Sequence, residues 1–440
     1  MIPPLCRTTA SDFEETFRAL EQRREVGQGF GPGERENVQH RVREIIQTVR
    51  ERGDEALLEY TERFDGVKLA PERLRVSEEE VEASLDAITD DLRRGLNLAA
   101  ERIRRFQESI MVEDPAPLRE GERELGLRYT PVDAAGICVP GASASLASSV
   151  LMNVIPAVVA GVDRVVMITP PRYDGTVSPD RLAAARIAGA DEIYRVFGAQ
   201  AIAALAYGTE SLPRVDFIAG PGNVYVATAK KTVFGRVGID MIAGPSEVVV
   251  IADETARPEW VAAELLAQAE HTHGSAILVT DHEPLARDVA DVVDEQAERL
   301  PRPEEVEACL EEYGALIVTK SGAECADLTN RIAPEHLVIM MDEPDDMRDR
   351  IRHAGAIFLG HHTPVAVGDY IAGPSHTLPT GTTARFSSGL TANHFLKSSS
   401  CVRYSAEALA DDGDAICDIA EAEALAAHAR SVRVRLDDRE

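Results

Sequence analysis

The chain has 440 residues, of which 44% are hydrophobic, so we expect two large domains with smaller appendages rather than one simple core. Its formal net charge of −29 at pH 7 repels nucleic acid and favours a cationic small-molecule substrate. The longest apolar runs fall far short of a membrane span, and residues 1–6 lack the basic start and apolar core of a signal peptide. We therefore expect a cytoplasmic protein with no nucleic-acid or membrane partner.

The scarcity of lysine and the spacing of the cysteines bear on the cellular environment of the protein and on the role of its thiols. Lysine is rare beside arginine, and one hypothesis is a salt-rich cytoplasm, in which case stability rises with salt. A GC-rich genome that favours arginine is the alternative explanation. The six cysteines show neither metal-finger nor redox spacing, so most of them are expected to be small buried hydrophobic residues.

The first part of the chain is predicted to be helical. Residues 10–24 form the pattern of a short amphipathic helix, and longer helical patterns cover about 34–64 and 77–109. The glycine-rich segment 27–33 superficially resembles a phosphate-binding loop, but no strand precedes it. We interpret it as a flexible linker.

From about residue 134, short β-branched runs alternate with helical stretches, which predicts parallel sheets flanked by helices. The first series of predicted strands covers 135–139, 164–169, 192–196 and 215–219, with helices such as 146–160 and 180–188 between them. The second series covers 247–253, 275–280, 315–319, 337–341 and 356–359.

Ligands of such sheets bind at the carboxyl ends of the strands, and four residues of the second series lie at or near predicted strand ends. They are Asp253, Thr280, His336 and Gly360. From about 391 the chain is predicted to be helical and acidic, with a basic strand-like end at 431–436. Fewer than about fifty residues would not fold alone, so this tail should pack on another domain or subunit.

The segment 331–385 holds more reactive side chains than its surroundings explain, and they lie at apparent turns. Glu335 and His336 are adjacent, and on a bend both would reach one cavity, where each can act as a base if its pKa is tuned. The alternative is that Glu335 caps a turn and His336 merely begins a strand.

A metal site is a second possibility, although its members are far apart in the sequence. Gln268 and His271 are three residues apart near the end of a helix predicted over 259–272, which places both on one face. Together with Asp369 and His428 they would form a nitrogen and oxygen site suited to zinc, or to manganese or cobalt. Each residue also has an ordinary explanation, such as a turn-forming Asp or a surface His.

Two glycine-proline segments, 220–223 and 244–247, follow strand-like runs. Glycine there permits close approach of the backbone to a ligand, although tight turns are the default explanation.

Several segments, in this order, resemble histidinol dehydrogenase, and the resemblance runs from about Gly53 to the end of the chain. The segments that carry it are 197–210, 219–223, 243–247, 268–271, 333–336, 368–379 and 423–428. Members of that family oxidise L-histidinol through the aldehyde to L-histidine, the last step of histidine biosynthesis, with two NAD and one bound zinc.

The resemblance implies a role for each matching residue. Glu335 and His336 match the catalytic pair, in which His336 takes the alcohol proton and Glu335 activates a water against the aldehyde. The zinc ligands would be Gln268, His271, Asp369 and His428, which also surround the substrate together with Ser246, His336, His376 and Glu423. The nucleotide contacts would be Gln200, Asn223 and the position of Cys138.

Cys138 is a departure from the family pattern. The family usually has Tyr-Val-Pro-Gly-Gly where this chain has Cys-Val-Pro-Gly-Ala at 138–142. A cysteine neither stacks on a ring as tyrosine does nor donates a comparable hydroxyl hydrogen bond. The resemblance therefore does not fix the affinity for NAD or its binding geometry at this position.

The predicted fold class is α/β, with two Rossmann-like, incomplete dinucleotide-binding domains built on parallel sheets and small helical arms at both ends. We expect an N-terminal arm over 1–30, a metal and substrate domain formed by 31–136 and 246–390, an NAD-side domain over 137–245, and a C-terminal arm over 391–440. The resemblance implies a homodimer in which His428 of the arm reaches the partner's site.

Three other functions remain as alternatives. One is a sister NAD-dependent dehydrogenase of the same scaffold that acts on another small alcohol, such as a sulfonated diol, although the carboxylate of Glu423 suits a cationic amino alcohol better. Another is a zinc hydrolase, which would turn over without NAD. A catalytically silent paralogue is opposed by the presence of every metal and acid–base position.

Overall fold

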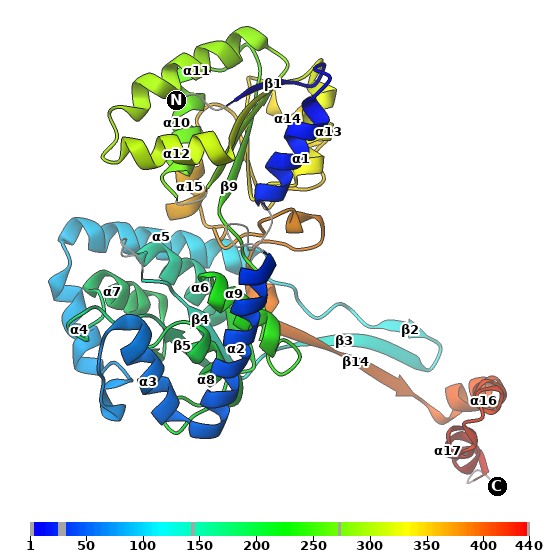
Figure 1. Ribbon diagram of the computed structural model, residues 1–440. Helices are drawn as coiled ribbons and strands as arrows, with labels where there is room; N and C mark the ends of the chain where they lie inside the picture. Colours follow the sequence, from blue (N-terminus) through cyan, green and yellow to red (C-terminus); the bar gives the residue numbers. More distant parts are fainter. Residues whose placement is uncertain (1–3, 25–31, 142–145, 272–273, 438–440) are drawn as a thin grey trace. The chain divides into compact units, whose positions relative to one another are not determined.

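A computed structural model describes residues 4–24, 32–141, 146–271 and 274–437 (Figure 1). The chain divides into two compact units, the larger formed by 1–109 and 133–395 and the smaller by 110–132 and 396–440. Most of the glycine-rich segment 27–33 lies outside the described residues, so the expected linker is not addressed.

The larger unit contains two parallel sheets. The first has six strands in the order β1-β11-β10-β9-β12-β13. Strands β9 and β10 are buried along their whole length, as expected for parallel strands covered on both faces by helices. The strands are β1 (Leu5–Arg7), β9 (Glu247–Ala252), β10 (Ser275–Thr280), β11 (Gly314–Val318), β12 (His336–Met340) and β13 (Ala356–Leu359).

Helices cover both faces of this sheet, and each layer has its own apolar cluster (Figure 1). One layer is formed by α10 (Pro258–Ala269), α11 (Glu283–Ala297) and α12 (Pro303–Tyr313), and the other by α1 (Phe13–Arg24), α13 (Gly322–Ile332) and α14 (Pro344–Arg348). Within the expected N-terminal arm, β1 pairs with β11, and α1 packs on the sheet through Phe13 and Phe17.

The second sheet has five parallel strands in the order β6-β5-β4-β7-β8. Counted along the chain, the order is the same as that of β9 to β13 in the first sheet. It is the order of the Rossmann fold, so the predicted fold class is confirmed. The strands are β4 (Ala134–Cys138), β5 (Arg164–Ile168), β6 (Glu192–Tyr194), β7 (Phe217–Ala219) and β8 (Gly238–Ile239).

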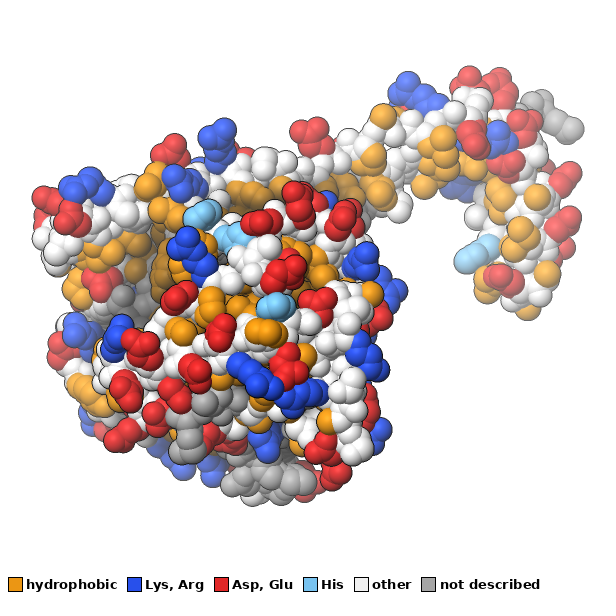
Figure 2. Space-filling model, turned by 90° about the horizontal axis from the view of Figure 1, so that it is seen from above, with side chains coloured by type: hydrophobic (Ala, Val, Ile, Leu, Met, Phe, Trp, Pro, Cys, Tyr) orange, Lys and Arg blue, Asp and Glu red, His pale blue; other side chains and the backbone are white. Residues whose placement is uncertain are grey.

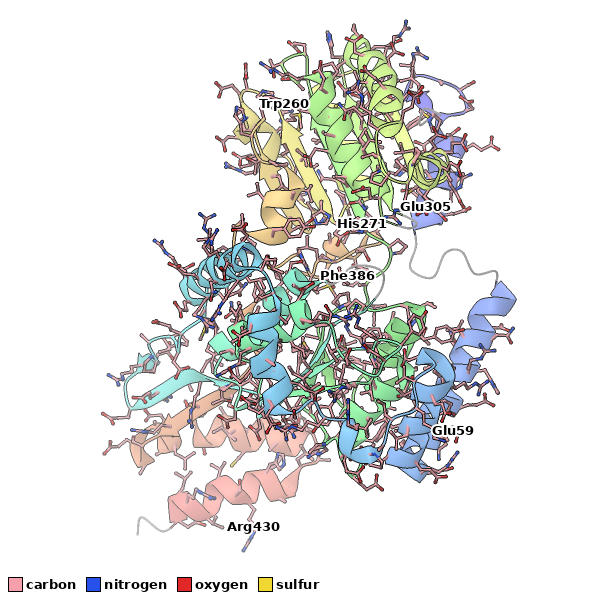
Figure 3. All side chains as sticks on the ribbon, turned by 90° about the vertical axis from the view of Figure 1, so that its left-hand side faces the viewer. Glu59, Trp260, His271, Glu305, Phe386 and Arg430 are labelled. Atoms are coloured by element: carbon pink, nitrogen blue, oxygen red, sulfur yellow. The ribbon has the colours of Figure 1, made fainter. Side chains whose placement is uncertain are left out.

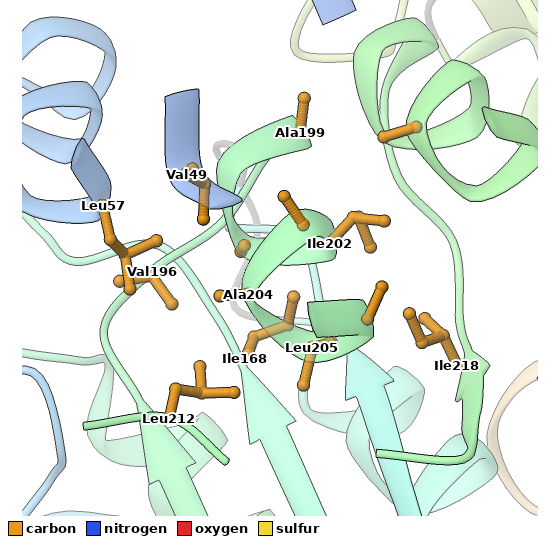
Figure 4. Close-up of a cluster of buried hydrophobic side chains, with 14 of the residues drawn as sticks. Val49, Leu57, Ile168, Val196, Ala199, Ile202, Ala204, Leu205, Leu212 and Ile218 are labelled. Atoms are coloured by element: carbon orange, nitrogen blue, oxygen red, sulfur yellow. The ribbon is translucent and has the colours of Figure 1, made fainter. Parts of the chain in front are cut away.

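The core of this second domain includes the first long helices of the chain (Figure 4). Val49 of α2 and Leu57 of α3 pack with Ile202 and Leu205 of α8. The domain expected over 31–136 and 246–390 includes these two helices, and their apolar faces complete the core of the second sheet. The helices around the second sheet are α2 (Pro32–Arg52), α3 (Asp54–Asp65), α4 (Glu78–Ala87), α5 (Asp90–Ser109), α6 (Ala147–Val159), α7 (Pro179–Ala188), α8 (Ala199–Tyr207) and α9 (Val224–Val233).

The smaller unit combines an antiparallel sheet with two helices. It consists of β2 (Leu118–Glu120), β3 (Arg123–Pro131), β14 (Leu396–Tyr404), α16 (Ala406–Ala422) and α17 (Ala426–Asp437), with strand order β14-β3-β2. Two expectations for the tail were wrong: β14 is a strand where a helical tail was predicted, and the strand-like end 431–436 lies in α17. The alternating pattern gives way because Ala429 and Val432, three residues apart, pack on Cys417 and Ala420 of α16.

Charged side chains are dispersed over the surface. On the face of the larger unit shown in Figure 2, acidic groups are interspersed with arginine and lysine instead of forming one patch. Among the described helices, none is both long enough and apolar enough to cross a membrane.

Candidate active site at the amino edge of the first sheet

The residue pair Glu335 and His336 lies where helix α13 turns into strand β12. The helix ends at Ile332, and Ala333 adopts a left-handed conformation with φ 48° while its N–H bonds to the carbonyl of Thr329. His336 is the first residue of β12. The pair therefore lies at the amino-terminal edge of the sheet, opposite to the carboxyl ends at which ligands of such sheets are expected to bind.

Glu335 is only 6% exposed, and two donors hold its carboxylate. Its Oε2 accepts from the hydroxyl of Ser246 at 2.7 Å and from the backbone N–H of Glu247 at 2.8 Å. Burial raises the pKa of Glu335 to about 7, although both bonds and the charge of His336 act against the rise. The carboxyl group is thus set for proton transfer near neutral pH. Ser246, expected to contact substrate, orients this carboxylate in the structure.

His336 is fixed in one tautomer by its backbone partner. Its Nδ1 lies 3.0 Å from the carbonyl oxygen of Glu247, and a carbonyl can only accept, so Nδ1 carries the hydrogen. Nε2 is buried with no hydrogen-bond partner in the described part of the chain and lies 3.6 Å from Oδ1 of Asp369. Burial lowers the pKa of His336, but the carboxylates of Glu335 and Asp369 outweigh it and raise the pKa to about 9.

Asp369 lies in the short helix α15 (Val365–Tyr370), not in the turn that we predicted. Burial acts to raise its pKa, but the imidazoles of His336, His376 and His271 together bring it below the ordinary value. These four side chains therefore share one electrostatic environment. The structure places Nε2 of His336 within 3.6 Å of Oδ1 of Asp369, and the charge of His271 acts on Asp369.

His376 is engaged within the protein at both ring nitrogens. Nδ1 donates to the backbone carbonyl of Asp369 at 2.9 Å, and Nε2 lies 3.1 Å from the hydroxyl of Ser149 on α6. Burial lowers the pKa of His376, so the neutral ring is favoured. Ser149 was missed, because a serine in an apolar helix carries no signal of its distant partner.

Gln268 and His271 lie at the end of α10 that is opposite to Trp260 (Figure 3). The helix ends at Ala269, so the prediction that both residues share a helical face was wrong in its boundary. A turn follows the helix, in which the N–H of His271 donates to the carbonyl of Gln268 at 3.1 Å. Gln268 is 5% exposed and its Nε2 is buried without a hydrogen-bond partner among the described residues, whereas His271 is exposed.

Whether the expected metal ligands of the larger unit suit a metal ion depends on their donor types. Within the described ranges, no three His, Cys, Asp or Glu side chains gather closely enough to hold a metal by themselves. The larger unit offers an amide, an imidazole and a carboxylate from Gln268, His271 and Asp369, which suit zinc. The spare hydrogen-bonding capacity of His336 Nε2, which lies 3.6 Å from Oδ1 of Asp369, also indicates that something polar belongs beside Asp369.

The two tail residues of the expected site belong to the smaller unit. Glu423 is the C-cap of α16, and Ala424 after it is left-handed with φ 59°. His428 lies in the first turn of α17, where the prediction of a helix is confirmed.

Two of the expected nucleotide contacts, Gln200 and Asn223, line a cavity of about 310 Å³ at the second sheet. Gln200 is 1% exposed and its Oε1 has no hydrogen-bond partner in the described chain. Asn223 caps α9 through Oδ1, which accepts from the N–H groups of Tyr225 and Val226, both at 3.1 Å. Asp65 also lines this cavity, and its role was missed because nothing marks it in the sequence.

Cys138 does not line this cavity. The residue is 0% exposed and belongs to the core of the second sheet, and burial raises the pKa of its thiol to about 12. Direct contact with a bound nucleotide would require the core to open.

A buried ion pair holds the glycine loop that leads to Asn223. The Lys230 ammonium contacts the Asp240 carboxylate, with side chains 3% and 0% exposed. Lys230 also donates to the carbonyl of Gly220 at 3.0 Å, and Asp240 accepts from the N–H of Gly220 at 2.8 Å. Gly220 has φ +104°, and a Cβ there would lie 2.3 Å from the carbonyl oxygen of Cys138. This position in the loop therefore requires glycine.

Comparison with known proteins agrees with this site. Residues 32–436 match the family described as histidinol dehydrogenase. A histidinol dehydrogenase of Geobacillus kaustophilus is 53% identical over 403 residues, covering 91% of this chain and 95% of the relative. That of Gloeobacter violaceus is 51% identical over 409 residues, covering 92% of each chain. The crystal structure of histidinol dehydrogenase from Elizabethkingia anophelis has a TM-score of 0.92 at 34% identity and covers 99% of this chain and 98% of its own. The chain therefore belongs to the histidinol dehydrogenase family.

Proposed function

We propose that this chain oxidises L-histidinol through L-histidinaldehyde to L-histidine, with NAD as the acceptor of both hydrides and one zinc ion per site. The observation that carries the proposal is the buried pair Glu335 and His336 facing Asp369. The protein supplies no hydride acceptor of its own, so a nicotinamide cofactor has to take the hydrides.

The two members of the pair would work in successive half-reactions. In the neutral ring of His336 the Nδ1 hydrogen is directed at the Glu247 carbonyl, so Nε2 would take the proton of the alcohol. The charge of Asp369 helps to raise the pKa of His336, so a metal that offsets this charge would lower that pKa and favour the neutral ring. Glu335, held by Ser246 and the Glu247 N–H, would take a proton from the water that attacks the aldehyde. Burial of both residues excludes competing solvent.

Gln268, His271 and Asp369 would hold the metal, and His428 of a second copy would complete the set. When bound, zinc would orient the substrate's imidazole and amine and offset the charge of Asp369. The carboxylate of Glu423, five residues before His428, would accompany it and suit a cationic amino alcohol.

We propose a homodimer with exchanged tails because the expected ligands lie in different units of the chain. Gln268, His271 and Asp369 belong to the larger unit, and Glu423 and His428 to the smaller one. A tail of this kind has few apolar residues of its own to bury, and a second copy would cover those that remain exposed, such as Ile419.

The test is the stoichiometry of the reaction. Purified protein with L-histidinol, NAD and zinc should form two NADH for each histidine. One NADH per substrate, with the aldehyde released, would contradict the four-electron reaction. Turnover of an ester or amide without NAD would instead indicate a hydrolase, and oxidation of a sulfonated diol in preference to histidinol would indicate a sister dehydrogenase.

Tail exchange is tested by mixing two inactive variants, His336→Asn and His428→Asn, under conditions that allow subunits to exchange. If His428 serves the partner's site, each mixed dimer contains one intact site, and activity appears on mixing. If His428 serves its own chain, every site keeps one defect and the mixture stays inactive. Each variant alone is the control.

A further inference from the structure

Helix α15, which carries Asp369, is held at both ends by buried side chains. At its C-terminal end, Nδ1 of His376 donates to the carbonyl of Asp369 at 2.9 Å. At its N-terminal end, the backbone N–H of Val365 donates to Oε2 of Glu264 on α10 at 3.0 Å. Pro364 at the N-cap offers no side-chain acceptor, so Glu264 supplies the cap from another helix.

The hydrogen bond between Val365 and Glu264 connects the two helices that carry the expected metal ligands of the larger unit. Glu264 lies four residues, or one turn, before Gln268, and Val365 lies four residues before Asp369. A single hydrogen bond therefore joins α10 to α15 one turn away from a ligand on each helix. Any rotation of one helix against the other would stretch this bond and separate the two ligands.

The packing around α15 leaves few other ways to fix it. The helix has six residues, too few to be stable without tertiary contacts. Its Gly368 lies against Phe358 of β13, where a Cβ would come within 2.6 Å of the ring. That contact sets how close the helix lies to the sheet, whereas the bond from Val365 to Glu264 sets its rotation and its position along α10.

Glu264 is 9% exposed, so its carboxylate is part of the interior and not of the surface. Burial raises its pKa, the Val365 N–H opposes this, and the charges of Asp369 and His336 also reach it. The Glu264 carboxylate contacts none of the expected metal ligands. It is placed to act on Asp369 through the backbone of α15, which it holds at the N–H of Val365.

We propose that Glu264 is a positioning residue that sets the distance between the ligand pair of α10 and Asp369, and thereby the affinity of the site for its divalent ion. The inference rests on the proposed zinc site. Substitution of residues that orient metal ligands costs about 10- to 100-fold in metal affinity, and we expect a loss of this size when the bond is removed.

The experiment measures the affinity of the metal-free full chain for Zn²⁺ by competition with a chromophoric chelator, and the visible absorption of the Co²⁺ form. Glu264→Ala should lose about 10- to 100-fold in affinity and change the Co²⁺ spectrum. Glu264→Gln keeps an oxygen acceptor for Val365, so it should stay close to wild type. An equal loss in both variants would overturn the proposal, because the charge and not the bond would then matter.

Val365→Pro removes the same bond from the donor side. Proline is accepted at the first position of a helix, so this variant keeps α15 while removing the N–H. It should reproduce the weaker binding of Glu264→Ala, and the double variant should be no weaker than either single one. Additive losses would overturn the proposal. The pair also keeps the test valid if Glu264→Ala folds poorly.

Glu259→Ala is the matched control, since Glu259 is exposed in the first turn of the same helix. It should bind Zn²⁺ as wild type does. Failure of wild type itself to bind Zn²⁺ would refute the proposed metal site, whereas normal binding by wild type and by Glu264→Ala alike would refute only the role of Glu264.

Discussion

The Nδ1 atom of His336 lies 3.0 Å from the carbonyl oxygen of Glu247, across the first residues of two neighbouring parallel strands. This bond fixes the tautomer of the ring, and strand pairing fixes its place, because His336 is in register with Val248. The free nitrogen then faces Asp369. A base whose proton-accepting atom is set by the backbone needs no rearrangement before reaction.

Replacing His336 with Asn should slow the oxidation of L-histidinol by about 10²- to 10⁴-fold, the usual contribution of a general base. Asn can still donate to the Glu247 carbonyl, so the fold should persist. Zinc content, measured by elemental analysis, should equal that of wild type because His336 is not an expected ligand. Loss of the metal in this variant would contradict the assignment.

Replacing Glu335 with Gln should impair the second half-reaction more than the first. The amide oxygen can still accept from Ser246 and from the Glu247 N–H, but the side chain no longer takes a proton from water. Rates measured with L-histidinol and with L-histidinaldehyde separate the two steps. Equal losses with both substrates would argue against water activation by Glu335.

The raised pKa of Asp65 predicts that the stability of the protein depends on pH. Burial raises its pKa from 3.8 to about 6, so the native state holds this proton more tightly than the unfolded chain does. The resulting stability is full below pH 3.8 and is lost as the pH rises through about 6. Asp65→Asn should therefore raise the melting temperature at pH 8 and have a smaller effect at pH 5. The control is Asp86→Asn at an exposed position, which should change little at either pH.

The buried pair of Lys230 and Asp240 predicts a large loss of stability when only one partner is removed. Lys230→Met leaves the Asp240 carboxylate without its counter-charge, which typically costs about 3–5 kcal/mol. Adding Asp240→Asn should recover part of the loss, because the amide oxygen still accepts from the N–H of Gly220. Urea unfolding measures the loss of stability in Lys230→Met and its recovery in the double variant.

The control for that series is the ion pair of Arg299 and Glu295, whose side chains are 71% and 65% exposed. Arg299→Ala should leave the urea midpoint nearly unchanged, since exposed pairs contribute little. A loss as large as that of Lys230→Met would show that burial is not the cause.

The NAD affinity of Lys230→Met should also fall, because the pair of Lys230 and Asp240 holds the loop before Asn223.

The sequence by itself determined most strands of the two parallel sheets, although β1 and β8 were not predicted. Buried parallel strands need apolar residues on both faces, so they stand out as short continuous runs, and 275–280 was predicted to the residue. The edge strand 356–359 was also predicted to the residue. Matching of local segments also yielded the proposed metal ligands Gln268, His271 and Asp369 and the proposed catalytic pair Glu335 and His336. These features depend on residues close together in the chain, where spacing and composition carry the information.

Only the tertiary structure decided what depends on contacts between distant residues. The strand-like end of the tail became helix α17 because its apolar residues pack on α16, and packing outweighs local propensity. The pair of Glu335 and His336 lies at the amino edge of its sheet because the alignment of β12 with β9 sets which strand ends meet. Ser149 and Glu264 act on partners more than a hundred residues away, and no local pattern encodes which backbone atom a side chain will meet after folding.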